Sequence, residues 1–136
     1  VIDTNLTGVF LCAREAAAHF VEQKKPGVII NIASVARSGN FGQSNYSAAK
    51  AGVSAMTVLW AQELAQHGIR VAAIAPGFTA TEMVVSLREE IKENFKKSIP
   101  LRRFAEPSEM SDGALFILKN DYYTGRVLEI DGVVRI

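Results

Sequence analysis

The hydrophobic positions along the chain follow a helical period in four segments. In residues 7–23 apolar side chains recur three or four positions apart, and Pro26 and Gly27 then stop the pattern. A second long segment ends just before Gly68, and glycine commonly terminates helices in a left-handed conformation. The predicted helices cover residues 7–23, 45–66, 87–97 and 107–118.

Short, nearly continuous apolar runs lie between these helices. Residues 28–33, VIINIA, and residues 69–75, IRVAAIA, are rich in β-branched side chains, which is typical of strands buried on both faces of a parallel sheet. A last strand is predicted over residues 125–130. A strand followed by a long helix and another strand forms a βαβ unit, so the pattern predicts an α/β protein with a parallel sheet.

Composition narrows the class of protein. The chain has 136 residues, 49% of them hydrophobic and 21% charged, as is usual for one globular domain. A net charge of +1 without basic runs argues against a nucleic-acid partner, and no apolar run reaches the length of a membrane span. No signal peptide opens the sequence, so we expect a cytoplasmic protein. The single cysteine, Cys12, is expected to be a small buried side chain.

Candidate chemistry gathers where the strand at residues 28–33 gives way to the helix at residues 45–66. Ser34 follows the strand, and Tyr46 and Lys50 open the helix four residues apart, so their side chains project from one face. An ammonium within a few Å of a phenol favours ionisation of the phenol. This pairing predicts a proton donor for an alkoxide that forms at the same place.

Four motifs in register carry a family resemblance. N-x-x-S ends the first strand, and YSAAKAG, P-G-x-x-x-T and a terminal D-G follow in that order. The chain resembles the second half of a short-chain dehydrogenase/reductase over essentially all of its length. More narrowly, GQSNYSAAKAG, IAPGFTATEM, IPLRRFAEPSEM and LEIDG resemble the 3-oxoacyl-acyl-carrier-protein reductase branch. The fold that this resemblance implies is a Rossmann-like doubly wound parallel sheet, of which the chain supplies three strands plus flanking helices.

The resemblance also implies a role for each catalytic candidate. Tyr46 would protonate the carbonyl oxygen of a ketone as hydride arrives, and Ser34 would donate a second hydrogen bond to that oxygen. Lys50 would keep the phenol acidic and hold the nicotinamide ribose hydroxyls. Asn5, within N-x-x-G-x-F, would hold a water that links Lys50 to solvent. The implied activity is NAD(P)-dependent reduction of a ketone, a 3-oxoacyl thioester in the narrower branch, to a secondary alcohol.

The cofactor is expected to be NADP or NAD, with NADPH favoured, and no metal is expected. Its nicotinamide carboxamide would be lined by a short segment after the second strand. The residues concerned are Pro76, Gly77, Thr79 and Thr81. Residues 78–105 are more polar and are expected to form a lid or wall of the substrate region. Both long helices are apolar on more than one side, so we expect a homodimer or homotetramer.

One departure from the family is large. The glycine-rich phosphate loop, the first strands and the residue that selects NAD or NADP are absent from residues 1–136. We therefore expect these residues to be the C-terminal part of a single Rossmann-type domain in a longer polypeptide. Alone, they should bind a dinucleotide weakly and be inactive, with the strand at residues 28–33 left as an unpaired edge.

Two other readings remain open at the level of sequence. Ser47 and Lys50 match the S-x-x-K signature of serine acyl-enzymes, which would make Ser47 a nucleophile in a hydrolase. The S-D-N and K-T-G motifs of those enzymes are missing, and the segment at residues 111–113 is only a partial match. The second alternative is a non-catalytic Rossmann-like domain that serves binding or assembly.

Overall fold

The computed structural model describes all residues from Val1 to Ile136 as one α/β unit. The strands are β1 (Gly27–Ile32), β2 (Ile69–Pro76) and β3 (Val127–Ile130). The α-helices are α1 (Gly8–Glu22), α2 (Ser44–Leu64), α3 (Glu82–Val85), α4 (Glu89–Ser98) and α5 (Pro107–Lys119). Single turns of other helix types precede α1 (Asp3–Thr7), follow β1 (Val35–Ser38) and follow α2 (Ala65–His67).

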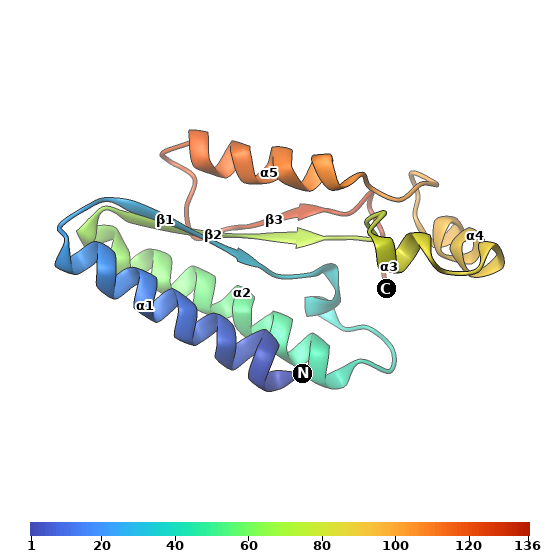
Figure 1. Cartoon of the computed structure of the whole chain (residues 1–136), viewed down its shortest axis with the longest axis horizontal. Helices are drawn as coiled ribbons and strands as arrows, with labels where there is room; N and C mark the ends of the chain where they lie inside the picture. The colour runs from blue at the N-terminus through green and yellow to red at the C-terminus, as the bar shows by residue number, and fades with distance from the viewer.

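The three strands form a parallel sheet in the order β1-β2-β3. Helices α1 and α2 cover one face and α5 covers the other, as Figure 1 shows. The central strand β2 is buried on both faces because Val71 and Ala73 pack toward α1 and α2, whereas Ala72 and Ile74 pack toward α5. This three-layer arrangement confirms the predicted fold class.

The predicted elements are present, with differences at their ends. Strand β3 begins at Val127 rather than at residue 125, because Gly125 adopts a left-handed turn with φ of 68°. In the polar region of residues 78–105, the helix expected at residues 87–97 is α4, and the short helix α3, which was not expected, precedes it. Gly68 ends the second long helix with φ of 71°, as its position in the sequence predicted.

The start of the chain differs more from the predicted elements, because residues before the first helix are also helical. Asn5 lies inside a π-helical turn, Asp3–Thr7, that leads directly into α1. Its side-chain Nδ2 donates to the Val1 carbonyl oxygen at 3.2 Å. Leu6 in the same turn contacts α2 at Gly52, where a Cβ atom would come within 2.7 Å of the Leu6 side chain. The turn therefore packs against α2 two residues beyond Lys50 because Gly52 leaves room for it.

Strand β1 forms one open edge of the sheet. An apolar hollow of about 590 Å³ lies between this strand and α1, and Ile32 is 53% exposed. Cys12 lines the hollow and is exposed, so the expectation of a buried cysteine was wrong. The periodicity of α1 identified an apolar face but not whether another element covers it. None of the helices is both long and apolar enough to span a membrane.

Candidate active site

Tyr46 and Lys50 lie on the first turns of α2. The Lys50 Nζ atom is 5.8 Å from the centroid of the Tyr46 ring, as the four-residue spacing predicted. Tyr46 is half-buried, and Lys50 is only 7% exposed. Burial lowers the pKa of Lys50 from its ordinary value because the ammonium loses hydration. The structure thus places a largely desolvated cation beside a phenol that remains accessible.

A hydrogen bond ties Lys50 to β1. Its Nζ donates to the Ile32 carbonyl oxygen at 2.7 Å. The next residue, Ala33, donates its backbone N–H to Ile74 on β2 at 2.7 Å, and successive residues of a strand direct their backbone groups to opposite sides. The Ile32 carbonyl therefore faces the open edge of the sheet. Lys50 satisfies that carbonyl, which holds the ammonium at the carboxyl end of β1.

Ser34 lies directly after β1 in an extended conformation, with φ of −167° and ψ of 156°. Its Oγ accepts a hydrogen bond from the Ala36 backbone N–H at 3.1 Å and so caps the turn Val35–Ser38. A hydroxyl that accepts in this way keeps its own O–H free to donate. That turn packs against α2, so Ser34 and the Tyr46–Lys50 pair occupy the same end of the sheet.

The candidate cofactor residues come together in a groove that follows β2. It has a volume of about 440 Å³ and is closed on one side by the start of α5. The lining residues are Pro76, Gly77, Phe78, Thr79, Thr81, Val84, Pro107 and Met110. Glycine is required at position 77, because a Cβ there would lie 2.7 Å from the Asp131 Cα. All four residues named from the sequence thus share one surface.

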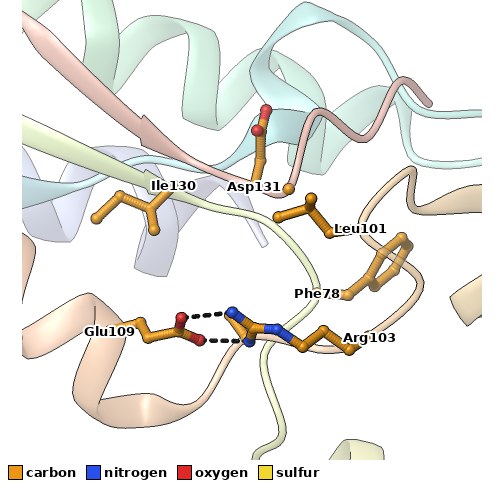
Figure 2. Close-up of a pocket in the computed structure, with 8 residues that line it drawn as sticks. Phe78, Leu101, Arg103, Glu109, Ile130 and Asp131 are labelled. Atoms are coloured by element: carbon orange, nitrogen blue, oxygen red, sulfur yellow. Dashed lines mark hydrogen bonds and ion pairs between the residues drawn. The ribbon is translucent and has the colours of Figure 1, made fainter.

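A small pocket of about 100 Å³ lies beside this groove and is drawn in Figure 2. Arg103 and Glu109 lie side by side in its lining and form two hydrogen bonds of 2.7 Å each. The Arg103 guanidinium lowers the pKa of Glu109 to about 2. Glu109 also accepts from the Glu106 backbone N–H and completes a capping box at the start of α5.

This ion pair has a structural role, because Arg103 and Glu109 form a two-point contact and Glu109 also accepts a hydrogen bond at the start of α5. It joins the end of the lid region to α5. The sequence analysis did not predict this pairing. The three-residue spacing of Glu106 and Glu109 around Pro107 was the signal for the capping box.

Ser47, the nucleophile of the hydrolase alternative, is poorly placed for that role. Its Oγ is buried and has no hydrogen-bond partner. A nucleophile needs access to substrate and a base that takes its proton. The nearby Lys50 ammonium is instead bonded to Ile32. The structure therefore gives this alternative no support.

The parallel sheet, with Ser34, Tyr46 and Lys50 near the carboxyl end of β1, is the arrangement of a Rossmann-type protein, and proteins of this class bind ligands at that edge. Comparison with known proteins narrows this class. The sequence profile described as enoyl-(acyl carrier protein) reductase matches residues 1–133. The chain belongs to the short-chain dehydrogenase/reductase family, as its motifs had indicated.

Individual relatives agree with this assignment. The 3-oxoacyl-[acyl-carrier-protein] reductase FabG of Thermotoga maritima is 44% identical over 135 residues, which cover 97% of this chain and 54% of that protein. A 3-oxoacyl-[acyl-carrier-protein] reductase of Synechocystis is 48% identical over 137 residues, with coverage of 97% and 53%. The crystal structure of 3-hydroxyacyl-CoA dehydrogenase type-2 from Mycobacterium avium superposes with a TM-score of 0.93 at 39% identity, covering 99% of this chain and 55% of that one. The chain spans about half the length of the curated relatives it matches.

Proposed function

We propose that these residues form the catalytic half of an NAD(P)-dependent reductase that converts a ketone to a secondary alcohol. The observation that best supports this proposal is the Tyr46–Lys50 pair at the carboxyl end of β1. The desolvated ammonium lies 5.8 Å from the centroid of the phenol ring. When bound, the nicotinamide cofactor supplies the hydride. The residues of this chain then need only to orient the ketone and to stabilise the oxyanion that develops on it.

The reacting oxygen is proposed to lie between two donors. Tyr46 gives its proton to that oxygen, and Ser34 donates the hydrogen bond that its capping role leaves free. Lys50 stabilises the phenolate that remains, and it is proposed to contact the ribose hydroxyls of the cofactor. Asn5 is proposed to hold a water that returns a proton toward Lys50. The packing of its neighbour Leu6 on Gly52 brings the Asn5 turn to this part of α2.

The groove after β2 fits the nicotinamide end of the cofactor. It is open, its floor carries no side chain at Gly77, and Pro76, Thr79 and Thr81 surround it with backbone and hydroxyl groups. NADPH is favoured over NADH by resemblance to the 3-oxoacyl reductases. A phosphate loop would have to come from outside residues 1–136, so we propose that they act as one part of a larger dinucleotide-binding domain with about twice this length.

The proposed substrate is a 3-oxoacyl thioester. This proposal is supported by two relatives whose names give activity on a 3-oxoacyl substrate.

Exposed apolar side chains on the outer surfaces of α1 and α2 support a homodimer or homotetramer built on these helices. They include Phe10, Leu11, Val58 and Leu59. We also propose that the enzyme acts in the cytoplasm, as expected from the sequence.

The test is an NADPH and NADH oxidation assay of the full-length protein with acetoacetyl thioesters and simple ketones. Tyr46→Phe should lower kcat by about 10²- to 10⁴-fold, because the general acid is lost, while cofactor binding measured by fluorescence titration is retained. Tyr122→Phe is the matched control, since Tyr122 is 98% exposed beyond the end of α5. Unchanged turnover in Tyr46→Phe would refute the assigned acid. A parent protein that binds cofactor and reduces no carbonyl would favour the non-catalytic alternative.

A further inference from the structure

The turn that carries Ser34 is anchored to the sheet by an ion pair that no sequence motif marks. Arg37, the third residue of the turn Val35–Ser38, donates from its Nη2 to Glu129 Oε1 at 2.5 Å. Glu129 lies on β3, 92 positions along the chain. Arg37 is 28% exposed at its side chain, and its Nε is buried without a partner. A buried, unpartnered donor is costly, so the arginine is held at this place by contacts that outweigh that cost.

The position of Glu129 on β3 places the ion pair next to the groove that follows β2. On β3, Glu129 is aligned with Ala75, and the next residue, Ile130, is aligned with Pro76 at the start of the groove. Ile130 also accepts a hydrogen bond from the Gly77 backbone N–H at 2.9 Å. The ion pair therefore spans the carboxyl edge of the sheet from the serine turn to the strand that supports the groove.

The rest of the turn is held on its other side. Val35 packs against the apolar cluster of Ile99, Phe104 and Val134, and Ala36 is only 3% exposed. Ser34 itself makes one side-chain hydrogen bond, to the backbone N–H of Ala36. The direction of its hydroxyl thus depends on how the turn sits, and Arg37 is the charged anchor of that turn.

We infer that Arg37 and Glu129 are positioning residues, which align Ser34 with the groove and act on turnover through it. This inference rests on the proposed function. Neither side chain is assigned a contact with substrate or cofactor. Because a misplacement of about 1 Å can cost up to about 100-fold in rate, we expect loss of the pair to lower kcat about tenfold with little change in KM. Loss of Arg37 removes this partly exposed ion pair together with the buried, unpartnered Nε, and the two effects oppose each other, so the thermal unfolding midpoint should barely move.

The experiment measures kcat and KM of the full-length protein with an acetoacetyl thioester. Arg37→Met and Glu129→Gln should each lower kcat about tenfold. Arg37→Lys, which keeps the charge, and the reversed pair Arg37→Glu with Glu129→Arg should recover most of the loss. The matched control is Arg14→Met, which breaks an exposed ion pair with Glu15 on α1 and should change kcat less than about twofold. Arg37→Met with unchanged kcat, or a loss that the reversed pair does not recover, would overturn the inference.

A second measurement separates positioning from a general structural effect. Hydride transfer is followed in single turnovers at high enzyme concentration, so that slow variants remain measurable. In a Ser34→Ala background, Arg37→Met should add less than about a twofold loss, because residues that act as a unit are not additive. A full additional loss would show that Arg37 acts independently of Ser34. If Ser34→Ala alone leaves the rate unchanged, the proposed role of Ser34 is wrong, a result distinct from failure of the ion pair.

Discussion

The two sides of the candidate site differ in how firmly the fold holds them. Helix α2, which carries Tyr46 and Lys50, buries six residues along its length. Helices α3 and α4 lie in residues 78–105, which the sequence predicted to form a lid and which are called the lid side; they bury none, although Phe95 and Val84 pack on a small cluster. Regions with few buried apolar contacts open at a lower free energy than the core. The side that carries Tyr46 and Lys50 is therefore part of the core, whereas α3 and α4 are expected to open at a lower free energy.

The largest expected difference in the free energy of unfolding comes from replacing a threonine by valine on each of the two sides. Thr57 is fully buried on α2, where its Oγ1 accepts from Asn31 Nδ2 at 2.9 Å and donates to the Val53 carbonyl oxygen at 2.8 Å. Thr57→Val leaves the Asn31 amide without this partner and should lower the free energy of unfolding by about 1–3 kcal/mol.

Thr81→Val is the matched variant on the lid side, where Thr81 is exposed and caps α3 without a side-chain hydrogen bond. It should change the free energy of unfolding by less than about 0.5 kcal/mol. Urea unfolding of both variants checks the pair. Equal costs would contradict the view that the two sides are held differently.

A strained residue lies beneath the lid side. Val133 has φ of 68°, a left-handed conformation that β-branched residues rarely adopt, and its N–H donates to Asp131 Oδ1 at 2.8 Å. Val133→Gly should raise the free energy of unfolding by about 1 kcal/mol, because relief of strain exceeds the added freedom of the unfolded chain. Val133→Ala keeps a Cβ and serves as the control in thermal unfolding. A similar gain in both variants would show that the branching at Cβ, and not the presence of a Cβ atom, causes the strain, and no gain in Val133→Gly would contradict the prediction.

The buried Lys50 on α2 should affect how the free energy of unfolding changes with pH in alkaline solution. Because burial lowers the pKa of Lys50 below 10.5, the folded state binds fewer protons than the unfolded state between the lowered value and 10.5. The contribution of Lys50 to stability therefore rises with pH across that window. Lys50→Met should show a shallower rise than the parent in urea unfolding at stepped pH. Parallel curves for the two proteins would mean that the ammonium is not desolvated.

The smallest effect on the free energy of unfolding is expected from Glu109, next to the lid side, at acidic pH. Arg103 holds the pKa of Glu109 near 2, below its model-peptide value of 4.5, so the stabilising ionised form is fully present above about pH 4.5. Its contribution is lost as the pH falls from 4.5 toward 2. Glu109→Gln should flatten this part of the stability profile and leave neutral-pH stability slightly lower. Glu93→Gln, which breaks an exposed ion pair with Lys96 on α4, is the control.

The local sequence pattern was sufficient to predict most helices and strands of this molecule and several residues of the candidate site. The period of apolar residues located the long helices, and the β-branched runs located β1 and β2, because side-chain direction repeats regularly along each type of backbone. The spacing of Tyr46 and Lys50 on one helix was enough to predict that they meet. The strand-end position of Ser34 and the run from Pro76 to Thr81 were likewise identified from sequence.

Contacts between distant segments were decided only by the tertiary structure. The bond from Lys50 to Ile32, the pairing of Arg37 with Glu129 and the exposure of Cys12 depend on which elements become neighbours. Periodicity names the face of a helix and not what covers it, so it could not anticipate the open hollow beside α1. The sequence determined the chemical groups and their local order. The packing of three strands between two helix layers determined the distances that bring those groups into one site.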